Sequence, residues 1–256
     1  MIRHLLQLIW NQRKQNAWLW AELLLVSVFL WFLVDYLYVM GRTYTAPLGF
    51  DIRHTYSIVI SSLSERSPDY IPKEKRERPD GVHLLTALDR IRTYPGVESA
   101  CLTDGGMPYY MGSRNLVWRI DTLQVPCRYA FVTPEFFDVF RIYDKDGKTA
   151  SLKRAIEDNN SIVISADVET MNPGLSLLGQ KAYRGNVTDE IEETIRGISV
   201  PIRRHEYTKA EPNVYRALRL SRMEEGYYEG MIDAVRLCVR VRPDVDNADF
   251  PARFRK

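Results

Sequence analysis

The longest apolar run of the chain covers residues 17–40 and reads AWLWAELLLVSVFLWFLVDYLYVM. A helix needs about 20 mostly apolar residues to cross the hydrocarbon core of a bilayer. Aromatic side chains that favour the membrane–water interface cluster toward the ends of this run: Trp18, Trp20, Tyr36, Tyr38 and Tyr44. A buried helix is disfavoured by the length of the run, and a signal peptide by the lack of a small-residue cleavage site. The pattern predicts a transmembrane helix.

Two acidic residues, Glu22 and Asp35, interrupt the apolar run about five residues from either end. An ionised carboxylate within the bilayer costs a few kcal/mol, and such residues usually face protein or water. Their separation of thirteen residues places them about 140° apart around a helix, so they do not share a face. Two interpretations remain open: either acid contacts another membrane helix, or both are tolerated near the membrane boundary.

The first sixteen residues combine an apolar helical face with positive charge. Apolar residues recur at helical spacing, which predicts a short amphipathic helix on the inner leaflet: Ile2, Leu5, Leu6, Ile9 and Trp10. Arg3, Arg13 and Lys14 occur here without any acidic residue. Because basic residues favour the cytoplasmic side, we expect a cytoplasmic N-terminus and a large domain outside the cytoplasmic membrane.

Shorter patterns in residues 41–256 predict a mixture of helices and strands. Residues 82–91 have apolar positions at helical spacing, and this helix should end before Pro95. The pair Thr133–Pro134 is typical of a helix start, and the aromatic residues that follow would pack this helix on a sheet: Phe136, Phe137 and Phe140. Apolar runs predict strands at 54–60, 97–102, 116–120, 128–132, 161–165, 182–184, 194–200 and 235–241.

The last predicted strand, residues 235–241, alternates apolar residues with Arg236, Cys238 and Arg240. This alternation is typical of an amphipathic strand with one buried and one polar face. The strand fits best beside the first strands of the domain, where it completes a split βαβ arrangement interrupted by a β-rich insertion. The sequence therefore predicts an α+β fold.

Composition and motifs argue against nucleic-acid binding and catalysis. The chain has 256 residues, with 35 Lys and Arg, 33 Asp and Glu and a formal charge of +2, so no basic excess suggests nucleic acid. No phosphate-binding Walker A motif occurs, and the four histidines lack zinc-motif spacing. Residues 144–148 resemble the start of a calcium loop, but its twelfth position is Ala155. We expect no catalytic, cofactor-binding or metal-binding residues.

The three cysteines are Cys101, Cys127 and Cys238, an odd number for an oxidising compartment. If residues 100–129 form a hairpin centred near Arg114, Cys101 and Cys127 would lie opposite each other. This predicts a candidate disulfide between them, while buried free thiols are an equal alternative because cysteine packs as a small apolar residue.

Six stretches follow one another along the chain: LGFDIRHTYSIVI, LLTALDRIRTYPGVESA, YAFVTPEFFDVFRI, SIVISADVETMNP with LLGQKAY, IRGISVPIRRHEY with EPNVY, and LCVRVRP. In this order they resemble the periplasmic core domain of MacB-type and FtsX-like ABC transporter permeases. The resemblance implies a porter-like βαββαβ subdomain with an inserted β-rich subdomain. The expected organisation is a cytoplasmic amphipathic helix (1–16), a transmembrane helix (17–40), a first porter-like part (41–140), the insertion (141–211) and a truncated second porter-like part (212–256).

The resemblance also implies a noncatalytic role in the inner membrane. A single-pass protein with a periplasmic domain would couple a separate cytoplasmic ABC ATPase to a periplasmic cargo or adaptor, as a dimer with itself or with a related permease. Family members carry three further membrane helices, which this sequence lacks, so we expect residues 1–256 not to transport alone. The alternative is a membrane-tethered periplasmic binding or sensor module. The reading frame beyond Lys256 and an adjacent ATPase would distinguish the two.

Overall fold

The computed structural model describes residues 2–11, 14, 17–61, 63–72, 75–110, 112, 114–158, 160–184, 190–226, 232–247 and 249–253. Arg13, one of the basic residues used above to predict orientation, lies outside these ranges. The chain divides into two compact units, Met1–Pro47 and Leu48–Lys256, of which the second is the folded domain.

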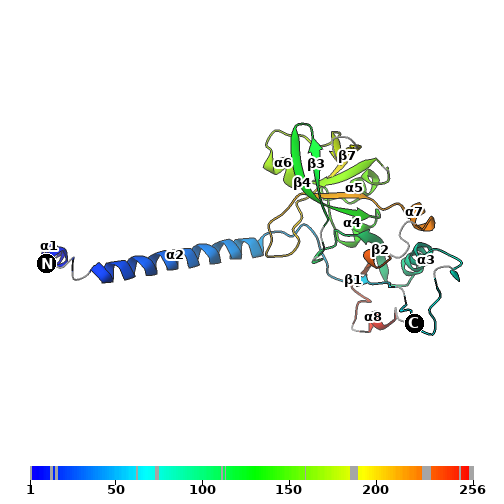
Figure 1. The fold of residues 1–256 in the computed structure, drawn as a ribbon, viewed down its shortest axis with the longest axis horizontal. Coiled ribbons are helices and arrows are strands. Elements are labelled where there is room, and N and C mark those ends of the chain that lie inside the picture. Colours follow the sequence, from blue (N-terminus) through cyan, green and yellow to red (C-terminus); the bar gives the residue numbers. More distant parts are fainter. Residues whose placement is uncertain are drawn as a thin grey trace. The chain divides into compact units, whose positions relative to one another are not determined.

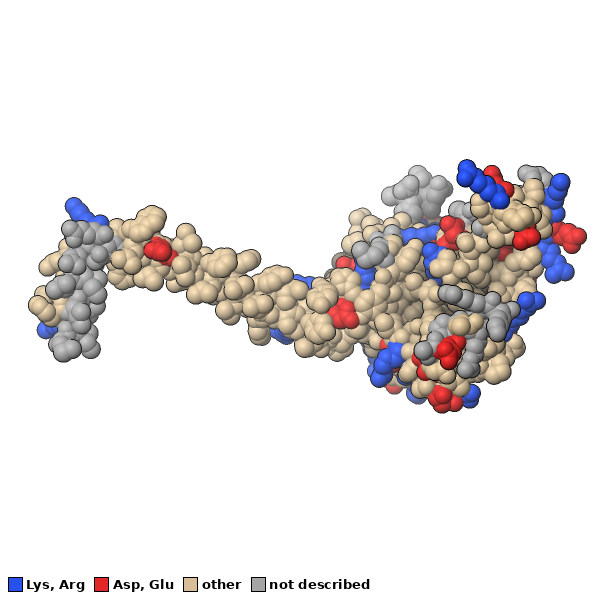
Figure 2. Space-filling view, turned by 90° about the horizontal axis from the view of Figure 1, so that it is seen from below, with Lys and Arg blue, Asp and Glu red and all other residues tan. Residues whose placement is uncertain are grey.

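The first unit consists of two helices, α1 (Ile2–Asn11) and α2 (Ala17–Thr45). Helix α2 continues five residues beyond the predicted end at Met40, and at 1.5 Å per residue it is about 43 Å long. It is long and apolar enough to cross a membrane, and none of its residues is buried. Figure 2 shows that charged residues are sparse on this helix and frequent on the folded domain. A helix that is apolar on all sides requires lipid or partner helices around it.

The folded domain is built on one sheet of nine described strands. In chain order its elements are β1 (Thr55–Ile58), α3 (Asp80–Arg92), β2 (Val97–Asp104), β3 (Asn115–Ile120), β4 (Leu123–Val132), α4 (Phe136–Val139), α5 (Ala150–Ala155), β5 (Ser161–Ser165), α6 (Asp167–Met171), β6 (Lys181–Arg184), β7 (Ile191–Ser199), β8 (Asn213–Ala217), α7 (Leu220–Glu224), η2 (Ile232–Ala234), β9 (Arg236–Val241) and α8 (Phe250–Arg253). Helices α3 and α7 are in contact beside the sheet (Figure 1).

Six of the strands close into a ring in the order β4, β3, β6, β7, β5, β8 and back to β4. Each of these strands contributes to one buried cluster that fills the ring, and Trp118 is its largest side chain. The remaining strands, β1, β9 and β2, join the ring at the C-terminal end of β4. The fold is a mixed α+β domain, as predicted. The sheet runs across the predicted boundary at residue 140, and the division into subdomains stays a prediction.

Strand β9 lies between β1 and β2, which confirms that the last strand returns to the first strands of the domain. The face of this strand that carries the polar residues is buried as well. Helix α4 contacts β9, and Cys238 and Arg240 are each only 1% exposed. The strand is central, so both of its faces are buried, which an alternating pattern does not predict.

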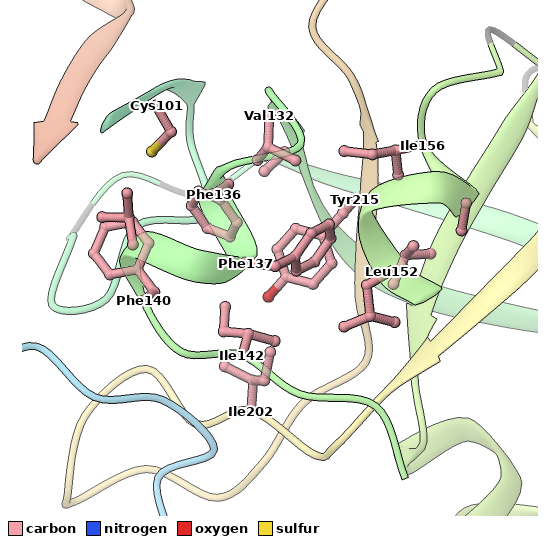
Figure 3. Close-up of a cluster of buried hydrophobic side chains, with 14 of the residues drawn as sticks. Cys101, Val132, Phe136, Phe137, Phe140, Ile142, Leu152, Ile156, Ile202 and Tyr215 are labelled. Atoms are coloured by element: carbon pink, nitrogen blue, oxygen red, sulfur yellow. The ribbon is translucent and has the colours of Figure 1, made fainter. Parts of the chain in front are cut away.

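Helix α4 supports that second face with an aromatic cluster. Phe136, Phe137 and Phe140 are buried, as the sequence predicted, and they pack with Tyr215 from β8 (Figure 3). The opposite face of β2 and β9 is covered by α3, whose Leu84 and Leu88 are fully buried. Strand β9 is therefore covered by α4 on one face and by α3 on the other.

Candidate functional site: the membrane anchor and its exit segment

The two acidic residues predicted as helix contacts, Glu22 and Asp35, are exposed on α2. Neither forms an ion pair with another described residue, and their spacing in the helix keeps them about 140° apart. The structure therefore does not bring them together. Their contact with another membrane helix stays a prediction.

Residues 48–53, which we call the exit segment, begin three residues after the end of α2 and are the first part of the folded domain. The carbonyl of Leu48 accepts a hydrogen bond from the Arg203 amide at 3.0 Å, and the Asp51 amide donates to the Phe140 carbonyl at 2.8 Å. Gly49 has φ of +83°, and a Cβ there would lie 2.1 Å from the carbonyl oxygen of Pro201. Only glycine fits this position.

The buried side chain of Arg240 connects the exit segment to the centre of the sheet. Its Nε donates to the Val139 carbonyl at 2.6 Å, its Nη1 to the Arg53 carbonyl at 2.8 Å, and its Nη2 to the Asp51 carbonyl. One guanidinium therefore joins β9, the end of α4 and the exit segment. Its planar set of donors suits this role better than the single ammonium group of lysine.

On the surface, the exit segment carries a small cluster of charges around Asp51. Arg53 binds both oxygens of the Asp51 carboxylate, with the Nη2 to Oδ2 distance at 2.9 Å, and Arg141 approaches it at 3.4 Å. A shallow cavity of about 330 Å³ lies beside this cluster, lined in part by Phe50 and Tyr143. Hydrogen bonds from Arg53 lower the pKa of Asp51 from 3.8 to about 2.

The Asp51 carboxylate gives an expected acid sensitivity. Its pKa is lower in the folded state than in the unfolded chain, so its stabilisation is present above pH 4 and is lost as the pH falls from about 4 to 2. Because the Arg53 side chain is 78% exposed, solvent screening should limit the effect to less than about 1 kcal/mol. We expect Asp51→Asn to reduce the acid-induced loss in urea-unfolding midpoint. Asp244→Asn is the matched control, and an unchanged pH profile for Asp51→Asn would contradict the assignment.

Sequence reasoning missed both Arg240 and Asp51 as parts of the exit-segment connections. Arg240 was assigned to a polar strand face, and its role depends on strands and carbonyls that are distant in sequence. The only local signal was Gly49 beside Phe50, nine residues after the end of the apolar run at Met40. Among the described residues, no group of three or more His, Cys, Asp or Glu is arranged to hold a metal ion.

The structure places the candidate disulfide residues apart. All three cysteines are buried and free. Cys127 lies opposite Leu116 in the β3–β4 pairing and belongs to the cluster inside the ring, whereas Cys101 belongs to the cluster beneath α4. The register aligns Cys101 with Cys238 instead. The hairpin on which the expected pair depended is replaced by separate pairings of β2 and β3 with β4.

No family model matches the chain, and no curated protein sequence matches it. Among solved structures, it is similar to a domain of a protein from Porphyromonas gingivalis that is provisionally described as a permease, with 20% identity and a TM-score of 0.46, covering 66% of this chain and 65% of that domain. It is also similar to the periplasmic region of MacB from Actinobacillus actinomycetemcomitans, with 9% identity, a TM-score of 0.46 and coverage of 83% and 86%. A third is the extracellular domain of the ABC-type transporter YknZ from Gram-positive bacteria, with 12% identity, a TM-score of 0.45 and coverage of 78% and 88%.

Proposed function

We propose that this chain is the membrane-anchored periplasmic core of a MacB/FtsX-like ABC transporter permease. It has no catalytic role of its own and couples a separate cytoplasmic ATPase to the handling of a periplasmic cargo or adaptor. The order of the six sequence motifs supports the family, and the basic N-terminal segment supports a cytoplasmic N-terminus in the inner membrane. Glu22 and Asp35 would contact other membrane helices, in a dimer with itself or with a related permease.

The observation that carries the coupling role is the set of contacts around the exit segment. A connection that transmits movement must be short and firmly attached at both ends. Only two residues, Ala46 and Pro47, separate the end of α2 from the start of the exit segment. Arg240 then joins that segment to β9, which is paired on both edges and covered on both faces. These contacts hold the first residues of the folded domain on its central strand, which supports a role for the exit segment in coupling.

The test is whether ATP changes the exit segment. The protein encoded by the reading frame that contains residues 1–256 would be reconstituted in liposomes with the ATPase encoded beside it. We expect nucleotide to change amide hydrogen exchange in residues 48–53, because a coupled element has two arrangements that the ATPase side can bias. Residues 162–164 of β5, inside the ring, serve as the internal control. Identical exchange with and without nucleotide would contradict coupling and favour a tethered binding module.

A further inference from the structure

Two cysteines that are far apart in sequence face each other across the centre of the sheet. Cys101 is in β2 and Cys238 is in β9, and the antiparallel register pairs them directly. Directly opposed residues have side chains on the same face, with Cα atoms about 4.5 or 5.5 Å apart. Disulfides occur at Cα separations of about 4.4–6.8 Å. The backbone of this pair therefore already suits a disulfide.

Both thiols are buried among apolar side chains of the described part of the domain. Both lie in the cluster beneath α4, and the Cys238 Sγ is 3.4 Å from the Sδ of Met107. Burial, together with a hydrogen bond to Cys238, raises the pKa of the Cys101 thiol. Because thiolates are the reactive form, the folded reduced protein should oxidise slowly. The bond would therefore form while the domain folds, before α4 covers the pair.

We propose that Cys101 and Cys238 form a cross-strand disulfide that closes when the domain folds in an oxidising compartment. The two thiols lose two protons and two electrons as the sulfur–sulfur bond forms. The electrons pass by exchange to an oxidising disulfide, carried by a thiol–disulfide oxidoreductase or by oxidised glutathione, which is reduced to two thiols. The compartment follows from the proposed function, whereas the pairing follows from the register alone.

This bond would reinforce the strand that holds the exit segment. Cys238 is two residues from Arg240, so the crosslink fixes β9 to β2 beside the guanidinium that joins β9 to the exit segment. The loop that it closes runs from residue 101 to residue 238, and crosslinks across long loops restrict the unfolded chain most strongly. We expect the oxidised protein to melt about 10 °C above the reduced protein.

Trypsin separates the three cysteines, which gives a direct readout. Cys101 falls in peptide 93–114, Cys127 in 120–128 and Cys238 in 237–240. The full chain would be reduced and unfolded, refolded in detergent with a glutathione redox buffer, alkylated, digested without reductant and analysed by mass spectrometry. We expect 93–114 linked to 237–240, lighter than the two free peptides by two hydrogen atoms, and alkylated 120–128. Free thiols at both positions, or a link between 93–114 and 120–128, would overturn the proposal.

Cysteine variants and protein made in bacterial cells allow the disulfide to be tested separately from the proposed topology. Cys127→Ala should retain the crosslink, whereas Cys238→Ala should abolish it without creating another. The same peptides would then be mapped from protein made in bacterial cells with an active periplasmic dithiol oxidase, and we expect the same link. If the pair crosslinks on refolding but remains reduced in these cells, the disulfide site stands and the outward location of the domain is refuted.

Discussion

Replacing Arg240 with methionine is expected to lower the free energy of unfolding by about 3–5 kcal/mol, because three carbonyls lose a hydrogen-bond donor. Methionine retains an unbranched apolar stem but removes every donor. The carbonyls of Asp51, Arg53 and Val139 would each lose a hydrogen-bond donor. A buried acceptor without a partner costs about 1–3 kcal/mol, and water entering beside Asp51 and Arg53 should recover part of that cost.

The measurement is urea unfolding of the detergent-solubilised full chain, followed by near-ultraviolet circular dichroism. The matched control is Arg242→Met two residues later, because that side chain is 55% exposed and lies 3.8 Å from its acidic partner Asp244. We expect the control to change stability by less than about 0.5 kcal/mol. Equal midpoints for the two variants would show that the Arg240 contacts contribute nothing beyond an ordinary surface arginine.

The same variant distinguishes a local connection from general stability. Because the guanidinium contacts the exit segment directly, amide exchange should accelerate in residues 51–53 even in conditions where the rest of the domain stays folded. A substitution that changes only global stability would not accelerate exchange selectively in residues 51–53. A uniform acceleration throughout the sheet, without an excess at the exit segment, would contradict the role of Arg240 in holding that segment.

Elements defined by local pattern could be predicted from the sequence. The apolar run gave α2, the helical spacing gave α3, and the aromatic residues after Thr133 gave a buried helix. The last strand was also placed correctly beside the first ones. These predictions hold because helix and strand periods are written in consecutive residues, and burial of an apolar face follows from them.

Features that depend on which distant strands meet could not be predicted. The closure of the ring requires β4 to pair with β8, about 85 residues later along the chain, and no local pattern encodes that contact. The burial of Arg240 and the alignment of Cys101 with Cys238 follow from β9 entering between two other strands. An arginine or cysteine at alternate positions looks the same whether its face is solvated or covered by α4.

Truncating Phe137 to alanine should cost about 3–5 kcal/mol of unfolding free energy, as expected for a large aromatic side chain removed from a packed core. The ring is fully buried, and it meets Phe136 and Tyr215 edge to face at centroid distances of 5.9 and 5.6 Å. Such aromatic contacts stabilise the folded state beyond the contribution of buried apolar area. Phe137→Leu, which fills most of the space, should lose less than half as much.

Phe140→Ala provides a second test of the same helix, because its ring lies 4.9 Å from that of Phe136 on the other side of the cluster (Figure 3). Tyr207→Ala is the control, since that ring is 60% exposed and its loss should stay within about 0.5 kcal/mol. Both Phe variants should melt below the wild type in thermal unfolding of the full chain. Helix α4 supports the face of β9 that carries Cys238 and Arg240. Phe137→Ala should therefore also increase amide exchange in residues 51–53. If both single variants have the melting temperature of the wild type, α4 does not support the sheet in the way that its buried rings indicate.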